Sequence, residues 1–248
     1  MRAKLSIALI GMLLLLRTAA AADHSSTLVE LFTSEGCDSC PPADAVLMRL
    51  AQQRNLAGVD VIVMSEHVDY WDHLGWRDPF SSRQFTDRQN EYAAALGFNI
   101  YTPQIIVDGR RDVLGGNYAA VLDTVSRASR ISKSSLTIEA KWRGKTLDLH
   151  VAANPVRETT KVYLAITEDN LSNNVSRGEN KGRRLTHAGV VRRLSLLGTA
   201  RSNVQFTADQ AIQLAPEWKT ADLHAVVFMQ STKTHAVLAV AETPFQNP

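Results

Sequence analysis

The sequence has only two cysteines in 248 residues, Cys37 and Cys40, and they stand three positions apart. A disulfide between them would close a loop over two residues, which constrains the unfolded chain weakly. The chain also lacks a G-x-S-x-G nucleophile elbow and a glycine-rich phosphate loop. These absences exclude a scaffold that depends on disulfides for its stability, and they leave a serine hydrolase or a phosphate-loop enzyme without support.

An excess of charge of either sign is missing too. The 27 lysines and arginines nearly balance the 25 aspartates and glutamates, for a net charge of +2. Three of the basic residues, Arg2, Lys4 and Arg17, lie within residues 1–22, and without them 24 basic side chains remain against 25 acidic ones. The composition therefore gives no electrostatic reason to expect nucleic acid or an anionic membrane as a partner.

Long apolar runs are absent after the N-terminus. Residues 1–22 combine a basic start, an apolar run over Leu5–Leu16 and small residues over Ala19–Ala22, which is a signal-peptide pattern with cleavage after Ala22. The run is shorter than the roughly 20 residues that a membrane-spanning helix needs, so a retained anchor is only the alternative. We expect a periplasmic or secreted protein without membrane attachment after cleavage, in a compartment where a disulfide can persist.

Residues 27–130 alternate strand-like and helix-like segments. Uniformly apolar runs at 27–33 and 59–65 are typical of strands buried on both faces, and a helical period follows each of them. The stretch 101–116 has the pattern of a strand, an Asp108-Gly109 turn and a second strand, and a third helix is expected after it. The order β-α-β-α-β-β-α predicts an α/β domain with a mixed sheet.

Residues 133–245 have a different character, with short alternating runs separated by turn residues and no long helical period. This pattern predicts an all-β sandwich domain of about seven strands. The polar stretch 168–187, rich in Asn and Gly, is predicted to be a long loop. The alternating runs are Leu136–Ala140, Leu147–Ala152, Val162–Thr167, Val190–Leu197, Leu223–Gln230 and Ala236–Ala241.

The two cysteines stand where the first strand gives way to the first helix. A sulfur exposed just beyond a helix N-terminus is favoured as a thiolate by the unpaired N–H groups and the helix dipole. A second sulfur one turn away can close a small ring and expel a bound partner. The spacing therefore predicts Cys37 as an exposed attacking thiol and Cys40 as the resolving thiol of a thiol–disulfide exchange site.

This C-x-x-C arrangement, together with the segment order around it, resembles the thioredoxin fold. That resemblance implies a cis proline at the start of the strand facing the dithiol. The segment "YTPQIIVDGR" supplies Pro103 at such a position, after Thr102. The resemblance implies that Pro103 shapes a substrate groove and that Thr102 offers backbone hydrogen bonds to a bound peptide.

A closer resemblance is to a family of exported bacterial proteins known as domain of unknown function 1223. The similar stretches are "VELFTSEGCDSCPPADAVL", "HVDYWDHLGWRDPFSSRQFTDRQ", "YTPQIIVDGR" and "GENKGRRLTHAGVVRRL", so the similarity covers nearly the whole mature chain. It implies a thioredoxin-like domain followed by a β-rich domain. It implies no substrate.

Three alternatives to redox exchange stay open. Cys37, Cys40 and His67 could together hold copper or zinc, since carboxyl ends of parallel strands gather in one place. The two cysteines could instead form an inert bridge. The aromatic loop, residues 69–80, could serve as the docking surface of a non-catalytic interaction module.

The sequence thus predicts an exported thiol–disulfide exchange protein that acts on envelope proteins carrying thiols or disulfides. Its predicted architecture is a thioredoxin-like domain over residues 27–130 and a β-sandwich domain over residues 133–245. No cofactor is expected. The oligomeric state and the direction of electron flow are not set by the sequence.

Overall fold

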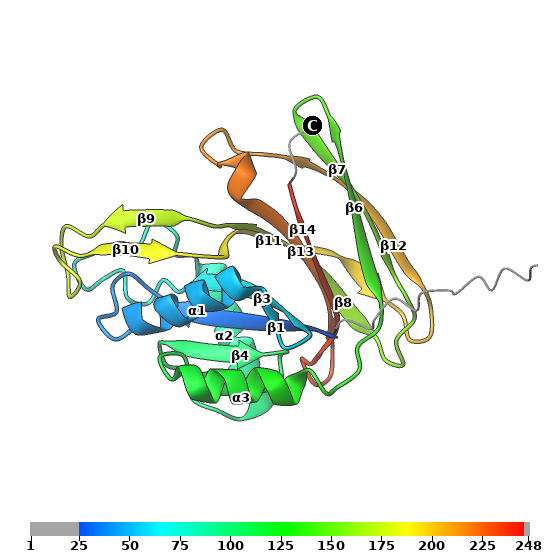
Figure 1. Ribbon diagram of the computed structural model, residues 1–248, viewed down its shortest axis with the longest axis horizontal. Helices are drawn as coiled ribbons and strands as arrows, with labels where there is room; N and C mark the ends of the chain where they lie inside the picture. The colour runs from blue at the N-terminus through cyan, green and yellow to red at the C-terminus, as the bar shows by residue number, and fades with distance from the viewer. Residues whose placement is uncertain (1–24, 246–248) are drawn as a thin grey trace, which may run out of the picture.

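A mixed nine-stranded β-sheet runs through the chain in the computed structural model, which describes residues 25–245 (Figure 1). The strand order is β14-β13-β8-β11-β3-β1-β4-β5, and β2 pairs with β3 outside this path. The pairs β1–β3 and β3–β11 are parallel, and the others are antiparallel. The strands are β1 (Ser25–Thr33), β2 (Asn55–Leu56), β3 (Val59–His67), β4 (Gln104–Val107), β5 (Arg111–Leu114), β8 (Thr160–Glu168), β11 (Val190–Ala200), β13 (Leu223–Ser231) and β14 (Val237–Pro244).

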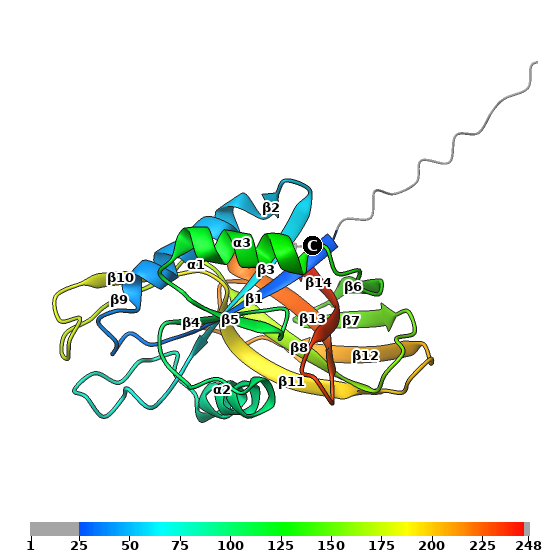
Figure 2. The same ribbon diagram turned by 90° about the horizontal axis from the view of Figure 1, so that it is seen from below.

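Helices cover both faces of the part of this sheet that contains β1, β3 and β4. Helices α1 (Pro41–Gln53) and α3 (Tyr118–Ala128) lie on one face, and α2 (Arg83–Leu96) lies on the other (Figure 2). Successive strand residues point to opposite faces, so Val29 and Val63 pack under α1 and α3 whereas Leu28 and Met64 pack on the side of α2. This burial on both faces explains why β1 and β3 are apolar throughout, as predicted.

The helix boundaries follow the capping signals in the sequence. Ser82 caps α2 by accepting a hydrogen bond from the N–H of Gln84, and Gly97 ends the helix in the left-handed conformation with φ of 74°. Asn117 caps α3 by accepting a hydrogen bond from the N–H of Ala120. The three predicted helices are confirmed.

A second, three-stranded antiparallel sheet covers the other end of the large sheet. It consists of β6 (Leu136–Arg143), β7 (Thr146–Ala153) and β12 (Phe206–Gln213). Val162, Leu164 and Ile166 of β8 face it, whereas Ala165 faces the side of α2. The six alternating runs are confirmed as β6, β7, β8, β11, β13 and β14. Strand β12 was not predicted.

The stretch predicted to be a long loop contains a two-stranded hairpin, formed by β9 (Leu171–Asn174) and β10 (Arg184–His187). The hairpin lies beside α1, away from the three-stranded sheet (Figure 1). Its strands pair only with each other among the described residues, and most of their side chains are polar. Because Leu171 and Leu185 are the only apolar residues of these two strands, their sequence carries a weak strand signal. One turn of 3₁₀ helix, η1 (Thr220–Asp222), precedes β13.

The predicted fold class, an α/β thioredoxin-like domain followed by an all-β sandwich domain, is wrong. Strand β11 pairs with β3 through Val190 and Ser65, and the N–H of Ser65 donates to the carbonyl of Gly189 at 2.7 Å. A side chain at Gly189 would lie 2.8 Å from the carbonyl oxygen of Val63, so only glycine allows this approach. Four of the strands expected in a separate sandwich, β8, β11, β13 and β14, therefore extend the first sheet.

The predicted boundaries of the two domains, residues 27–130 and 133–245, stay predictions. The predicted signal peptide, residues 1–22, lies outside the described residues. Within residues 25–245, no helix combines the length and the apolar character needed to cross a membrane.

Candidate functional site

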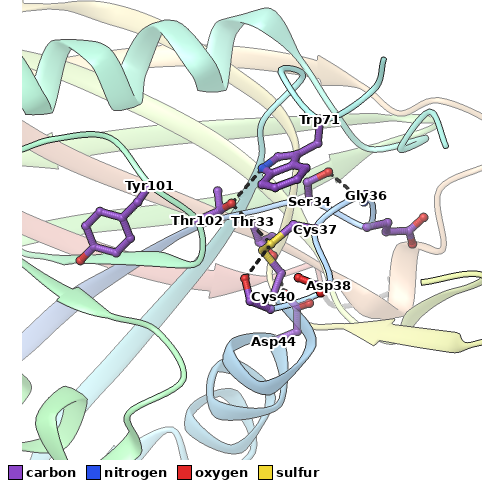
Figure 3. The surroundings of a disulfide bond; sticks show 12 residues. Thr33, Ser34, Gly36, Cys37, Asp38, Cys40, Asp44, Trp71, Tyr101 and Thr102 are labelled. Atoms are coloured by element: carbon purple, nitrogen blue, oxygen red, sulfur yellow. Dashed lines mark hydrogen bonds between the residues drawn. A yellow bond between two sulfur atoms is a disulfide. The ribbon is translucent and has the colours of Figure 1, made fainter. Parts of the chain in front are cut away.

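The two cysteines form a disulfide in the loop between β1 and α1, which we call the disulfide loop, residues 34–40 (Figure 3). Their Cα atoms are 5.4 Å apart. The N–H of Cys37 donates to the carbonyl of Ser34, and the N–H of Cys40 donates to the carbonyl of Cys37. These turns bring both sulfurs to the start of α1, where Cys40 is the N-cap residue.

Neither cysteine is exposed. The exposed fraction of both Cys37 and Cys40 is 0%, although Asp38 and Ser39 between them are exposed. The prediction that the sulfur of Cys37 is exposed at the helix tip is wrong for this conformation. A partner cannot reach either sulfur until part of the covering structure moves.

The helix start stabilises a thiolate less than the sequence analysis expects. Pro41 and Pro42 occupy the first two helical positions and have no N–H groups. The N–H groups of Ala43 and Asp44 donate to the carbonyl of Cys40. No N–H of these four residues is directed at a sulfur, and two adjacent prolines after Cys40 were a readable signal of this.

Hydroxyl groups are the polar neighbours of the Cys37 sulfur. The hydroxyl of Thr102 donates to Sγ at 3.4 Å, and the Ser39 hydroxyl lies 3.3 Å from it. The Thr102 oxygen also accepts a hydrogen bond from Nε1 of Trp71 at 2.9 Å (Figure 3). Trp71, from the aromatic loop, is thereby held beside the disulfide.

The predicted cis bond is confirmed at Thr102–Pro103, and Thr102 lies against the disulfide as expected. Pro103 is buried at the start of β4, beside Gly115. A Cβ added at Gly115 would lie 3.4 Å from Cβ of Pro103 and 2.7 Å from Cβ of Ala43. Gly115 therefore allows the segment after β5 to pack closely on Pro103 and α1. The predicted contact of Thr102 and Pro103 with a substrate stays a prediction.

The connection between β9 and β10, residues 175–183, covers the disulfide loop, and we call it the hairpin connection. The buried side chain of Asn180 donates to the carbonyls of Cys37 at 2.8 Å and Glu35 at 2.9 Å. Oε2 of Glu179 accepts a hydrogen bond from the N–H of Asp38 at 3.2 Å. Arg183 in turn donates to the side-chain oxygen of Asn180 at 2.9 Å. These bonds hold the hairpin connection on the disulfide loop.

Two carboxylates and a histidine form a buried charged cluster behind the disulfide. Nε2 of His187 lies 3.1 Å from Glu35, and Nδ1 lies 3.8 Å from Asp44. Burial lowers the pKa of His187, but the two carboxylates outweigh burial and raise it to about 10. Thr33 donates to Asp44 at 3.0 Å, and Trp76 donates to Glu35 at 2.9 Å. His187 is therefore an imidazolium that holds these carboxylates together.

His67, the third member of the alternative metal set, belongs to a different arrangement. Its Nδ1 lies 2.6 Å from Oδ2 of Asp78, and its ring packs edge-on against Phe80 and His187. Burial raises the pKa of Asp78, but the charge and hydrogen bond of His67, together with the N–H groups of Glu35 and Phe80, lower it by more. Within residues 25–245, no three His, Cys, Asp or Glu side chains form a group that could hold a metal ion. The structure does not bring Cys37, Cys40 and His67 together as ligands.

Asn180 and the buried position of His187 were not predicted from the sequence. Both residues reach the disulfide loop from more than 140 positions along the chain. His187 stands near several arginines, which favours reading it as part of a solvated basic face. Nothing in the local sequence distinguishes it from its neighbours.

Comparison with known proteins gives a family without an assigned activity. The family model described as "Protein of unknown function (DUF1223)" matches residues 28–230. A search of curated proteins finds no match.

A solved structure resembles most of the chain. A protein from Agrobacterium tumefaciens is 26% identical, with a TM-score of 0.73 over 92% of this chain and 98% of its own. This similarity spans both predicted domains, in agreement with the continuous sheet. A domain of the outer membrane lipoprotein Omp28 from Porphyromonas gingivalis is 12% identical, with a TM-score of 0.29 over 47% of this chain and 90% of its own. That likeness carries no argument.

Proposed function

Since the chain belongs to the DUF1223 family of proteins of unknown function, we propose its function from its own site: reversible thiol–disulfide exchange at Cys37 and Cys40. The observation that supports this proposal most strongly is the contact between the Cys37 sulfur and the hydroxyl of Thr102, across from the helix start. A hydroxyl donor beside one sulfur can stabilise the thiolate that exchange requires.

The exchange would proceed in two steps. The Cys37 thiolate attacks one sulfur of a partner disulfide, so a Cys37–partner bond forms, the partner S–S bond breaks, and one partner thiol leaves with a proton. Cys40, having lost its proton, then attacks the Cys37 sulfur and expels the second partner thiol. Two electrons pass from the dithiol to the partner, and the Cys37–Cys40 bond is restored. The reverse sequence oxidises a partner dithiol.

The surroundings favour a weakly acidified Cys37. Pro41 and Pro42 remove two N–H donors from the helix start, and Glu35 and Asp44 place two carboxylates behind it that the single charge of His187 balances only in part. Nearby negative charge raises a thiol pKa. We therefore propose a site that acts towards reduction of its partner, or exchanges slowly.

Exchange requires an open form of the site. The hydrogen bonds of Asn180 and Glu179 hold the hairpin connection over the disulfide loop, and Trp71 stands beside the sulfur of Cys37. The smallest change that would expose Cys37 is release of the hairpin connection, because it breaks three hydrogen bonds and leaves the large sheet intact.

We propose that the partner is an envelope protein with thiols or disulfides and that the protein is periplasmic or secreted. Both proposals depend on the signal-peptide pattern in residues 1–22 and on the presence of a disulfide.

An inert structural bridge is the second candidate, and the full burial of both cysteines favours it. The two candidates differ in whether the bond opens while the protein stays folded. The position of His67 speaks against the metal-carrier alternative, because His67 is held by Asp78 rather than directed to the cysteines.

The test is a redox titration of the native protein in dithiothreitol buffers, with thiol labelling at each potential. Exchange predicts reversible labelling of both cysteines below the unfolding transition. A Cys40→Ser variant is expected to capture a partner as a mixed disulfide, whereas Cys37→Ser is not. A bond that is reduced only when the protein unfolds would refute exchange and establish the inert bridge.

A further inference from the structure

A cavity separates α1 from the β9–β10 hairpin, on the side of the hairpin away from its connection. Its volume is about 510 Å³, within the range of sites that hold small molecules. Six of the residues around it are Met48, Gln52, Leu171, Ser172, Arg184 and Thr186. Two of these come from α1 and four from the hairpin, so an occupant would touch both elements.

The charge available in the cavity is positive. Arg184 has no carboxylate within ion-pair distance among residues 25–245, and its one hydrogen bond, at 3.1 Å, goes to the hydroxyl of Ser172. The other charged lining residues are already paired. Arg54 lies 2.7 Å from Glu242 and 3.4 Å from Asp169, and His187 lies 3.1 Å from Glu35. The guanidinium of Arg184 therefore has N–H donors available for a ligand, and a planar anion such as a carboxylate fits the geometry of these donors.

The remaining lining suits an organic anion rather than a bare ion. Thr186 donates only to the sulfur of Met48, a weak acceptor, so its hydroxyl can turn to a ligand oxygen. Met48 and Leu171 are partly buried and add an apolar wall. An inorganic anion would leave this wall uncovered.

We propose that this cavity binds a small organic carboxylate, with its carboxylate on Arg184 and its apolar body against Met48 and Leu171. The bound molecule bridges α1 and the hairpin. Because the same hairpin carries Asn180, occupancy also holds the hairpin connection closed over the disulfide. This effect depends on the cover and not on the proposed exchange activity, since any chemical reductant must pass the same cover.

The test is calorimetric titration of the full chain with hexanoate, with hexanamide as the uncharged control and inorganic phosphate as the anion without an apolar body. Hexanoate is expected to bind, and the other two are not. Arg184→Gln is expected to weaken hexanoate binding at least about tenfold, the loss of one charge-assisted contact. Arg184 and Arg177 are both exposed, but Arg177 does not line the cavity, so Arg177→Gln removes the same charge and is expected to change nothing.

A second readout separates this proposal from the redox function. Saturating hexanoate is expected to slow reduction of the disulfide by a phosphine reductant, and Arg184→Gln is expected to abolish the slowing. Absence of hexanoate binding, equal binding of hexanamide or phosphate, or unchanged binding in Arg184→Gln would each overturn the carboxylate site. None of these outcomes bears on whether Cys37 and Cys40 exchange with a partner.

Discussion

His187 places a positive charge inside the protein, and the neighbouring carboxylates of Glu35 and Asp44 stabilise that charge. On folding, the imidazolium loses its hydration and gains ion pairs with Glu35 and Asp44. It stabilises the fold only while it keeps its proton. The pKa of His187, about 10 against the usual 6.5, means that the folded chain holds this proton more tightly than the unfolded chain. Its contribution is complete below pH 6.5 and is lost as the pH rises towards about 10.

The stability of the wild-type protein is therefore expected to fall across this range. We expect the free energy of unfolding to lose about 3–5 kcal/mol more between pH 6.5 and 10 than that of a His187→Gln variant, which has no proton to lose there. Urea unfolding of both proteins at several pH values measures the difference, and the comparison cancels the titration of other groups. Parallel pH profiles for the two proteins would contradict the ion-pair role of His187.

A second buried cluster lies on the α2 face of the sheet. Arg88 donates through Nε to Glu30 at 2.9 Å, and the hydroxyl of Tyr92 donates to the same carboxylate at 2.6 Å. Burial raises the pKa of Glu66 well above its usual value; Arg88 opposes this rise, and Glu30 adds to it. The two carboxyl groups therefore differ: Glu30 forms the shorter ion pair with Arg88, whereas Glu66, 3.3 Å from Nε of Arg88, holds a proton more tightly than an exposed glutamate does.

Removing the charge from each carboxyl group should have opposite consequences. Glu30→Gln is expected to cost about 3–5 kcal/mol, because it leaves the Arg88 guanidinium buried without its main partner. Glu66 contributes most below pH 4.5, and its contribution is lost as the pH rises through its raised pKa. The stability of Glu66→Gln relative to the wild type is therefore expected to rise as the pH increases above 4.5. Equal losses in both variants, measured by urea unfolding, would contradict this assignment.

The sequence allowed prediction of the residues whose roles depend on local order. Cys37 and Cys40 stand at a strand–helix junction, and Thr102–Pro103 precedes a strand, so both are readable within a short window. Asn180 and His187 owe their positions to packing between distant segments, and hydrogen bonds over such separations leave no local pattern.

At the scale of elements, the β9–β10 hairpin lies outside the large sheet, and its strands pair only with each other among residues 25–245. Its connection contacts the disulfide loop through three side-chain hydrogen bonds, whereas Asn173 and His187 in its strands hold Glu35. Segments with few buried apolar contacts open at low free-energy cost. The cover over Cys37 is therefore weak compared with the sheet beneath it.

Asn180→Ala tests that cover. It removes two hydrogen bonds to main-chain carbonyls, so reduction of the native disulfide by a phosphine reductant is expected to be at least about tenfold faster. Asn174→Ala, an exposed change in β9 of the same hairpin, is the matched control and is expected to keep the wild-type rate. Equal rates in all three proteins would mean that another segment, such as the one holding Trp71, limits access.

Elements with a strong period or clear caps were predictable, and the weaker ones were not. Ser82 and Gly97 mark the ends of α2, and the apolar runs mark β1 and β3. Strands β9, β10 and β12 are mostly polar or exposed, so period-2 alternation is faint in them. Such strands exist because a neighbouring strand supplies hydrogen bonds, which the sequence of either strand alone does not reveal.

At the scale of the whole molecule, the two predicted domains share one core as well as one sheet. Leu28, Ile62 and Met64 from the first half pack with Val226 and Phe228 from the second. Arg88 of α2 reaches Gln230 of β13 at 3.1 Å, and the N–H of Val237 donates to the carbonyl of Asp108. A sequence does not show which strand will pair with the edge of an existing sheet. The strand-rich second half was therefore predicted to form a separate domain.

A chain of residues 25–132 is therefore expected not to fold by itself. It would keep β1, β3 and three helices but expose the apolar face of Leu28, Ile62 and Met64 and the free edge of β3. Near-ultraviolet circular dichroism and urea unfolding measure this, with the full chain as reference. A cooperative transition in the fragment would show that the first half is an independent domain.

The pairing of β3 with β11 also has a consequence for biosynthesis. Strand β3 leaves the ribosome long before Val190 has been translated, so the main-chain groups around Ser65 wait for a partner that does not yet exist. During this interval the nascent chain exposes an unpaired strand that can form hydrogen bonds with strands of other chains. A holdase chaperone that shields this strand until β11 emerges should raise the yield of native protein more than one that acts after release.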